Sequence, residues 1–316
     1  MSSTDLEVVK DYSGRDYRTV WHGPRAAFED RFERKLIEEM LPGERGWFVD
    51  VGAGYGRLHP LYAAEGRKVV MVDYALSLLE EAARTLGGRG DVFFVAANAY
   101  RLPFRSGSFD SGFSMRTFHH MAHPERFLGE FARVLRGGSH ALLEYSNKRN
   151  LPRMLRHGRS SLRKDHEEYG DLLFGTHPAY FEELAASAGM TVDHSRGTGF
   201  LSRIVTERTR PAVPLFAAAE AGADAVFGSR GLAPITFADL RVGGDARSSP
   251  DGEAPAADLA DMLQCPACGG ALRATGDGMG CVSCERLYPK VGAVHDFRFV
   301  GPLDSGEAEA GGSESS

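Results

Sequence analysis

The sequence has no run of 18 apolar residues, only four cysteines and no excess of positive charge. The missing apolar run excludes a transmembrane helix. Lys and Arg number 37 against 43 Asp and Glu, a net charge of −6, which disfavours a protein that coats nucleic acid through bulk charge. The opening segment MSSTDLEVVKDYSGRD lacks the basic and apolar regions of a secretory signal, so we expect a cytoplasmic protein with no membrane association.

Short apolar runs alternate with amphipathic stretches from residue 46 onward, in a chain of 316 residues that is 42% hydrophobic and 25% charged. This alternation predicts an α/β fold with a doubly wound parallel sheet and helices on both faces. The expected strands are residues 47–51, 69–73, 91–97, 108–115, 140–146, 190–195 and 235–242. The expected helices are residues 61–67, 76–88, 124–138, 177–189 and 211–228.

Composition shifts divide the chain further. Apolar residues between 28 and 40 recur at helical spacing until Pro42-Gly43, which predicts a helical lead-in. Gly, Pro and Ser mark a linker, and acidic residues without apolar ones mark a disordered tail. The expected units are the lead-in 1–42, a main domain 43–243 with inserts at about 147–175 and 208–231, the linker 244–258, a cysteine module 259–300 and the tail 301–316.

A glycine-rich loop, Gly-Ala-Gly-Tyr-Gly at residues 52–56, follows the first expected strand and opens a helix. Glycine lets the backbone turn sharply and approach a ligand closely. A dinucleotide fold has its third glycine where Arg57 stands, which disfavours NAD and FAD. Asp73 ends the second strand, 21 residues after Gly52, where a carboxylate can accept both hydroxyls of a ribose. The loop alone is also compatible with a tight turn, but with Asp73 it favours a cofactor with a ribose and a base and no pyrophosphate.

Five segments in register carry a family resemblance: FVDVGAGYGRL (48–58), VVMVDYA (69–75), AANAYRLPF (96–104), SFDSGFSMRTFHHM (108–121) and FLGEFARVLRGGSHALLEY (127–145). In their order and spacing, the chain resembles the class I S-adenosylmethionine-dependent methyltransferases. The resemblance implies a Rossmann-like doubly wound sheet, S-adenosylmethionine as cofactor and transfer of its methyl group.

The resemblance also implies cofactor contacts. Asp73 would take the ribose hydroxyls and Tyr74 would lie against the adenine. Asn98 stands where the family usually has Asp, and its carbonyl oxygen can still accept a hydrogen bond from the adenine amino group. The implied cofactor residues are Asp50, Gly52, Ala53, Gly54, Gly56, Asp73, Tyr74, Asn98, Ala99, Met115, Arg116 and Thr117.

Methyl transfer is an in-line displacement for which the protein mainly positions the acceptor and excludes water. Should a general base be used, the candidates after the fourth and fifth strands are His119, His120 and Tyr145, since His suits neutral pH. The alternative is that the His pair belongs to loop packing. The lead-in aromatics would either fold over the cofactor as a lid or pack on the sheet edge. The candidate substrate and lid residues are Tyr12, Tyr17, Trp21, Arg25, Asn147 and Arg149.

Residues 148–164 hold seven Lys and Arg residues and no acid. Such a segment suits an acidic or phosphorylated substrate or RNA. The alternative is a solvated basic helix that is balanced by the acidic segment DHEEYGD at 165–171.

The four cysteines form two pairs with metal-ligand spacing, Cys265 with Cys268 and Cys281 with Cys284. In a cytosolic chain two such pairs favour a closed structural zinc site over disulfides. Residues 259–297 resemble the small zinc-ribbon proteins of the Trm112 type, with CPACGG-L, the second pair and a following YP. Those proteins activate and solubilise methyltransferases, commonly by adding a strand to the enzyme's sheet edge. The resemblance therefore implies a partner supplied in cis.

The favoured interpretation is a methyltransferase with a fused zinc-ribbon module that acts on a small-molecule acceptor, a metabolite or natural product. The alternative is an enzyme that acts on RNA or a translation factor. A third hypothesis is a catalytically silent scaffold that binds the cofactor, but the glycine loop and Asp73 are intact. The fourth strand ends in SMRTF rather than the (N/D)PP(F/Y) of amide and base N-methyltransferases, which disfavours that chemistry.

Overall fold

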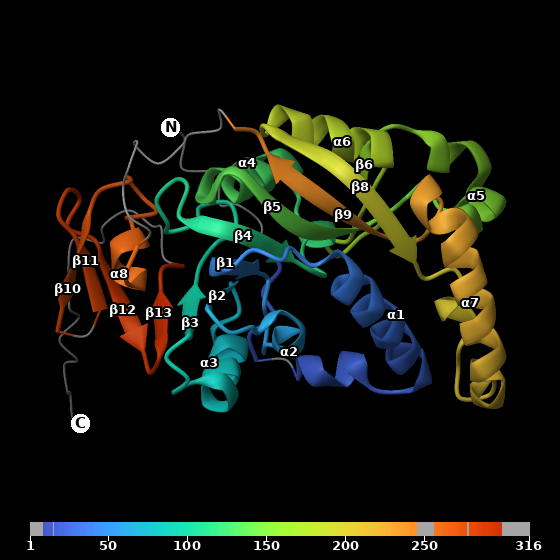
Figure 1. The fold of residues 1–316 in the computed structure, drawn as a ribbon, viewed down its shortest axis with the longest axis horizontal. Coiled ribbons are helices and arrows are strands. Elements are labelled where there is room, and N and C mark those ends of the chain that lie inside the picture. Colours follow the sequence, from blue (N-terminus) through green and yellow to red (C-terminus); the bar gives the residue numbers. More distant parts are fainter. Residues whose placement is uncertain (1–8, 15, 245–255, 277, 299–316) are drawn as a thin grey trace, which may run out of the picture.

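A single twisted sheet runs through the protein (Figure 1). The computed structural model describes residues 9–14, 16–244, 256–276 and 278–298. The sheet has 11 strands in the order β10-β11-β12-β13-β3-β2-β1-β4-β5-β9-β8. The strands of its main part are β1 (Gly46–Val51), β2 (Arg67–Asp73), β3 (Val92–Ala96), β4 (Phe109–Ser114), β5 (Leu135–Ser146), β8 (Met190–Thr198) and β9 (Ile235–Val242).

Strands β1 to β5 are parallel, and β9 runs antiparallel between β5 and β8. The Rossmann-like doubly wound α/β fold is confirmed, with an antiparallel pair at one edge that the expectation of a parallel sheet did not include. The chain passes from β8 through α7 (Val213–Phe227) into β9. Strand β9 then inserts between β5 and β8, antiparallel to both.

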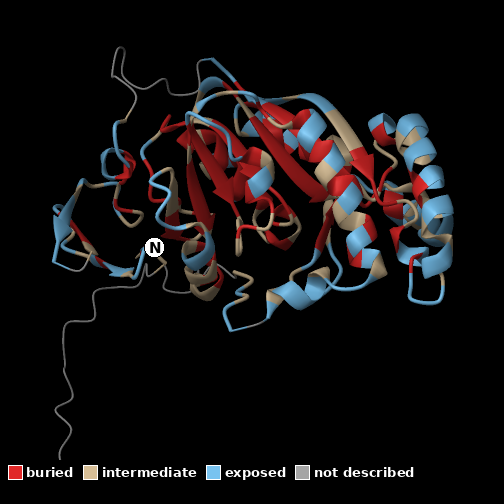
Figure 2. Cartoon of the chain, turned by 60° about the horizontal axis from the view of Figure 1, so that its bottom comes forward, coloured by how far each residue is buried: buried red, intermediate tan, exposed pale blue. Residues whose placement is uncertain are grey.

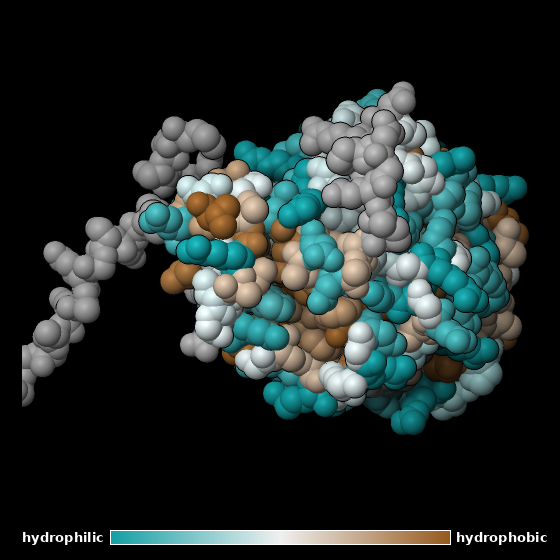
Figure 3. All heavy atoms as spheres, turned by 60° about the vertical axis from the view of Figure 1, so that its left-hand side comes forward, coloured by the Kyte–Doolittle hydropathy of each residue, from teal (hydrophilic) through white to brown (hydrophobic). Residues whose placement is uncertain are grey.

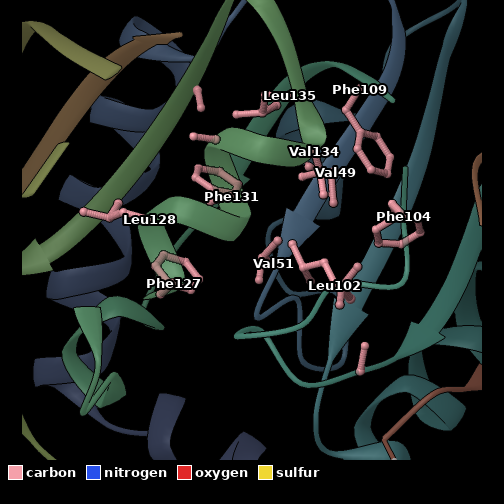
Figure 4. Packing of buried hydrophobic residues seen from close by; sticks show 14 of the residues in the cluster. Val49, Val51, Leu102, Phe104, Phe109, Phe127, Leu128, Phe131, Val134 and Leu135 are labelled. Atoms are coloured by element: carbon pink, nitrogen blue, oxygen red, sulfur yellow. The ribbon is translucent and has the colours of Figure 1, made fainter. Parts of the chain in front are cut away.

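Helices cover both faces because side chains of the parallel strands alternate between two apolar clusters. On one face, α1 (Pro24–Met40), α2 (His59–Tyr62) and α3 (Leu76–Leu86) pack on residues such as Phe48. On the other face, α4 (Pro124–Val134) and α6 (Pro178–Ser187) pack on Val49 and Val51. Figure 2 shows buried strands between helices whose outer sides are exposed, and Figure 4 shows Phe131 and Val134 of α4 beside β1.

Two expected helices are shorter in the structure. The helix over 61–67 is wrong in its bounds, because α2 ends at Tyr62 and Gly66, with φ of 76°, turns the chain into β2. The helix over 124–138 ends at Val134, and β5 begins at Leu135, so that the following glycines lie in a strand. The remaining expected elements appear with small shifts of their ends, and the lead-in also forms a 3-10 helix, η1 (Tyr17–Trp21).

The insert after β5 contains α5 (Leu151–His157), the 3-10 helix η3 (Gly158–Leu162) and the hairpin of β6 (His166–Glu168) and β7 (Phe174–Thr176). A short 3-10 helix, η2 (Phe118–His120), follows β4.

The cysteine module continues the main sheet. It comprises α8 (Leu259–Met262), β10 (Leu272–Thr275), β11 (Gly278–Cys281), β12 (Leu287–Val291) and β13 (Val294–Asp296). Strand β13 pairs in parallel with β3, in the register Val294 with Phe94 and Asp296 with Ala96. This is the edge pairing that the resemblance implied, and it satisfies backbone groups at an otherwise open edge. Figure 3 turns this side forward and shows mostly hydrophilic residues with small, separated apolar areas.

The expected linker 244–258 lies partly outside the described residues, and the acidic tail 301–316 lies wholly outside them. The described end of the linker packs on the sheet: Trp47 Nε1 donates to the carbonyl oxygen of Ala256 at 2.8 Å, and Lys68 Nζ donates to that of Ala257 at 2.7 Å.

We predict that Phe131→Ala lowers the free energy of unfolding by about 3–5 kcal/mol, because the ring is fully buried between α4 and the sheet. Urea unfolding followed by circular dichroism measures the change. The exposed neighbour Glu125→Ala is the matched control and should stay within about 0.5 kcal/mol of the wild type. Equal stability of Phe131→Ala and the control would contradict the assigned packing.

Candidate active site

Two adjoining hollows open at the carboxyl ends of the parallel strands, where open α/β sheets bind ligands. The larger has a volume of about 740 Å³ and the smaller of about 390 Å³, and both volumes include space that is open to solvent. Of the predicted site residues, the larger is lined by Tyr12, Tyr17, Gly52, Gly54, Asp73, Tyr74, Asn98, Ala99, Met115, Arg116, Thr117 and His120. The smaller is lined also by Trp21, Asp50 and Ala53.

The glycine loop folds back onto β2. The backbone N–H groups of Gly52 and Ala53 donate to the carbonyl oxygen of Val72 at 2.7 and 3.0 Å. Gly52 has φ of 85°, and a Cβ there would lie 1.7 Å from the Thr117 hydroxyl oxygen, so only glycine fits. Gly56 has φ of 81° and packs against the core side chain of Met71 rather than lining either hollow.

Asp73 ties the loop to the end of β2. Its Oδ2 accepts the Gly54 N–H at 2.8 Å, and its Oδ1 accepts the Ala75 N–H at 2.8 Å. Burial raises the pKa of Asp73, while these hydrogen bonds act in the opposite direction. Each carboxylate oxygen keeps acceptor capacity for a further donor, so the group can receive ligand hydroxyls from the cavity.

Asn98 differs from its expected role in one respect. Its Oδ1 already accepts the backbone N–H of Tyr100 at 2.9 Å. A carbonyl oxygen has two lone pairs, so the same atom can accept a second donor from a ligand. Ala99 lines the cavity beside it.

The smaller hollow is strongly charged. Asp50 lies there, only 3% exposed, and its Oδ2 accepts the Tyr62 hydroxyl at 2.5 Å. Burial raises the pKa of Asp50 to about 7, with a further increase from Asp73, against the Tyr62 hydrogen bond and Arg57. The guanidinium carbons of Arg57 and Arg116 lie 3.4 and 5.3 Å from the ring centroid of Trp21.

Carboxylates of α1 hold both arginines. Glu33 is 3% exposed and pairs with both, contacting Arg116 closely and Arg57 at 3.3 Å. Asp30 pairs with Arg57, and Glu29 lies 3.4 Å from Arg116. Burial disfavours the charge on Arg116, but the carboxylates outweigh it and raise the pKa of that group. Sequence reasoning did not assign Arg57, Asp30 or Glu33 to the site, although the acids of the lead-in and the Arg at the third-glycine position were visible.

His120 joins three segments at the larger cavity. Its Nε2 lies 2.9 Å from the Tyr12 hydroxyl, and its Nδ1 lies 2.9 Å from the carbonyl oxygen of Leu172. The His119 ring lies against it at a tilt, with ring centroids 4.2 Å apart, but does not line the larger cavity. Burial is the largest cause that lowers the pKa of both imidazoles, and the effect is stronger for His119.

Tyr145 is not brought to either hollow. It is 3% exposed and stacks on Phe181, with ring centroids 4.3 Å apart, in the cluster beneath α6. The structure therefore places this candidate in the core. Successive side chains of a strand point to opposite faces of the sheet. Glu144 points to one face of β5 and accepts the Arg116 backbone N–H at 2.8 Å, so Tyr145 points to the other face, toward α6.

Three further candidates lie away from the hollows. Asn147 is 1% exposed, and its Nδ2 donates to the carbonyl oxygens of Gly231 and Ala233, so it ties the end of β5 to the chain before β9. The backbone N–H of Arg149 donates to Asn147 Oδ1. Arg25 is exposed and pairs with Glu29 at 2.9 Å.

The basic segment is balanced by the acids that follow it. Lys148 is fully buried and pairs with Asp165 and with Glu167, the latter at 2.7 Å. Arg153 lies 3.3 Å from Glu167, and Arg163 lies 3.3 Å from Asp165. Three of the seven basic residues thus pair with these two acids inside the insert.

The four cysteines converge as a metal site requires. Their Sγ atoms all lie within 4.8 Å of one another. Cys265 and Cys284 are 3.6 Å apart and Cys268 and Cys281 3.5 Å apart, too far for S–S bonds of about 2.05 Å and close to the edge of a zinc–sulfur tetrahedron. The Tyr288 hydroxyl lies 3.0 Å from Cys265 Sγ, as an outer-shell donor.

The cysteine module contacts the chain beside the larger cavity. The Phe297 N–H donates to the carbonyl oxygen of Ala96 at 2.7 Å, next to the cavity wall. Arg298 pairs with Asp296 at 2.7 Å, donates to the carbonyl oxygen of Tyr74 at 3.3 Å and lies 5.8 Å from the centroid of its ring.

Comparison with known proteins finds similarity to methyltransferases. The family described as "Methyltransferase domain" matches residues 49–143, which run from β1 into β5. A demethylmenaquinone methyltransferase from Renibacterium salmoninarum is 32% identical over 120 residues, 37% of this chain and 48% of that protein. The O-methyltransferase cnsE from Penicillium expansum is 27% identical over 198 residues, 59% of this chain and 64% of that protein. The chain spans about half the length of most of these curated relatives.

A solved S-adenosylmethionine-dependent methyltransferase from Mesorhizobium loti matches 68% of this chain and 99% of its own, with a TM-score of 0.51 and 17% identity, which shows the fold. Residues 49–143 are thus similar to the methyltransferase-domain family, and the chain shares the fold of a solved S-adenosylmethionine-dependent methyltransferase. Among the helices that the structure describes, none combines the length and apolarity that a membrane crossing requires.

Proposed function

We propose that the protein transfers the methyl group of S-adenosylmethionine to a small-molecule acceptor. The observation that carries this proposal is the cavity at the carboxyl ends of β1 to β4, in which the glycine loop and the partly buried Asp73 carboxylate are joined by a hydrogen bond of 2.8 Å. The matched methyltransferase segment contains both groups.

The residues present fit each part of this cofactor. Asp73 offers acceptors for the ribose hydroxyls, while Tyr74 and Ala99 supply walls for the adenine. In the smaller hollow, Asp50 offers a negative charge for the ammonium group of the methionine part, and Arg116 offers donors for its carboxylate. Arg116 Nε and Trp21 Nε1 are buried there and have no hydrogen-bond partner among the described residues, which suits a ligand that supplies acceptors.

When bound, the cofactor supplies an electrophilic methyl carbon. The lead-in closes the cavity over it: Tyr12 and Tyr17 line the larger hollow, and Trp21 lines the smaller. Such a cover excludes water and holds the acceptor in line with the methyl group.

A small acceptor is favoured over RNA by three observations. The cavity is covered by the lead-in rather than open as a groove, and the basic insert is paired internally with Asp165 and Glu167. The relatives named above act, by their names, on demethylmenaquinone or on oxygen acceptors.

We expect Asp73→Asn to abolish stabilisation by the cofactor or its product. Saturation of the wild type at 100 times Kd contributes about 2.7 kcal/mol, which raises the Tm by roughly 5–10 °C. Differential scanning fluorimetry with S-adenosylhomocysteine measures the shift. Glu65→Gln removes an exposed carboxylate at the opposite end of β2 and should keep it. A full shift in Asp73→Asn would refute the ribose contact, and a bound cofactor without turnover on any acceptor would favour the silent scaffold.

Binding should also release a proton from Asp50. Its pKa of about 7 in the free protein falls when a cation binds beside the carboxylate, so affinity rises with pH between about 6 and 8 and changes by at most tenfold per pH unit. Calorimetry in two buffers of different ionisation enthalpy measures the released proton. Asp50→Asn should lose this component, whereas Glu144→Gln, whose native carboxyl also has a pKa raised by burial to about 7, should retain it. Unchanged release in Asp50→Asn would contradict the assignment.

We further propose that the cysteine module is a Trm112-like ribbon, held by one structural zinc ion, that stabilises the methyltransferase domain in cis. The sulfur geometry and the lack of an added ligand suit a closed site. The β13–β3 pairing and the contacts of Phe297 and Arg298 give the module a direct influence on the wall around Tyr74.

The Cys265→Ser variant should lose about one zinc ion per chain, because a structural zinc site needs all four ligands. Native mass spectrometry measures the metal, and calorimetry should show weaker binding of S-adenosylhomocysteine. Ser283→Ala changes an exposed residue of the same turn and keeps the thiolates, so it should behave as wild type. Full zinc content in Cys265→Ser would exclude the ribbon assignment.

A further inference from the structure

His120 lies where the lead-in meets the β6–β7 turn, at the wall of the larger cavity. It is 8% exposed. Its helix η2 is anchored by Phe118, which is fully buried against Phe127 and Phe181. The imidazole is therefore held on a rigid support beside the space in which the acceptor must sit.

The hydrogen bonds of His120 define which nitrogen carries the proton. The carbonyl oxygen of Leu172 can only accept, so Nδ1, 2.9 Å away, is the donor. In the neutral ring Nε2 then bears the lone pair, and it receives the Tyr12 hydroxyl at 2.9 Å. Burial lowers the pKa of the imidazole below 6.5, so this neutral form prevails at pH 7.

The carbonyl that sets this tautomer belongs to a strained turn. Asp171 and Leu172 both have positive φ, of 53° and 55°, although neither is glycine. The left-handed conformation is unfavourable for residues other than glycine, so the surrounding contacts must hold the turn in place. Lys10 of the lead-in fixes the turn, since its Nζ contacts the Asp171 carbonyl oxygen at 3.0 Å and its Oδ2 at 2.6 Å. The strained turn is thus fixed from outside and holds the carbonyl group that sets the tautomer of the cavity-lining His120.

We propose that His120 Nε2 accepts the proton of an aromatic hydroxyl group on the methyl acceptor, and that the Tyr12 hydroxyl marks the position of that group. The inference rests on the proposed methyltransferase function and deepens it by naming the acceptor class. Tyr12 is itself a phenol, so the bond it donates to Nε2 is the bond that a phenolic acceptor makes once Tyr12 has moved aside.

The step balances without a further reactant. The hydroxyl proton passes to Nε2, an oxygen lone pair forms the O–CH₃ bond, and the electron pair of the broken C–S bond stays on sulfur. The products are a methyl ether, S-adenosylhomocysteine and an imidazolium, which returns its proton to solvent.

The walls around this point suit an aromatic ring. Tyr12 and Tyr17 lie edge to face, with ring centroids 5.0 Å apart, and Val9 and Met121 complete an apolar lining. Lys10, which also lines the cavity, has its charge paired with Asp171. A flat apolar acceptor with one hydroxyl group therefore matches the cavity better than a charged one.

The test uses the full-length zinc-loaded protein, S-adenosylmethionine with a tritiated methyl group, and a panel of phenols and naphthols beside aliphatic alcohols and amines of similar size. We expect label in phenolic methyl ethers and none in the alcohols or amines. His120→Gln should lower kcat on the accepted phenol by at least about 100-fold and keep the Tm shift with S-adenosylhomocysteine. The exposed His157→Gln is the matched control.

Two further variants separate a chemical role from a structural one. His120→Ala should regain activity when imidazole is added. Tyr12→Phe should lower KM for the accepted phenol, because its hydroxyl no longer competes with the acceptor for Nε2. The kcat/KM of the wild type should fall when the pH drops below the pKa of His120, which lies under 6.5. The groups that face this imidazole are Tyr12, His119, Lys10 and Asp171. His120→Gln should remove this pH dependence.

The outcomes are distinguishable. Absence of cofactor binding by the wild type would overturn the proposed function itself. Cofactor binding with no phenol methylated, with methyl groups on carbon or nitrogen, or with an unchanged rate in His120→Gln would overturn only this inference.

Discussion

The partly buried Asp73 carboxylate makes the contacts on which the site depends. It accepts one N–H from the glycine loop and one from the chain entering α3, so it fixes the end of β2 and the loop above β1 as one unit. A buried carboxylate is costly unless donors surround it. The two backbone donors offset part of the desolvation cost of this carboxylate, and the hydroxyl groups of a ribose would offset more of it. The free protein is thus preorganised for a ligand that brings hydroxyl groups.

A second set of charges couples the lead-in to the same cavity. Glu33 of α1 pairs with Arg57 after the glycine loop and with Arg116 after β4. The two arginines flank Trp21, so charge and ring contacts add to the apolar packing of α1 on the sheet. An acidic ligand group that engages Arg116 would compete with the α1 carboxylates, which links occupancy of the smaller hollow to the seating of the lid.

The alternation of strands and helices and the spacing of the glycine loop to Asp73 were predictable, because they follow from local periodicity and backbone geometry. The position of β9 between β5 and β8 was not, since pairing partners in a sheet depend on long-range packing. The same limit explains Tyr145 and Asn147, which sit at site-like positions in sequence but turn toward the core and toward Gly231. The role of Glu33 depends on a helix–loop contact that no spacing rule encodes.

The cysteine module is connected to the cavity wall through the sheet itself. Because β13 pairs with β3, the end of the module leaves the sheet at the same edge as the chain that carries Asn98, and Arg298 comes to lie over Tyr74. A module of about 40 residues needs a staple such as a metal to hold its strands. Its covalent attachment raises the local concentration of β13 at the β3 edge. A metal ion bound by the four cysteines would therefore influence the wall around Tyr74 through the β13–β3 pairing.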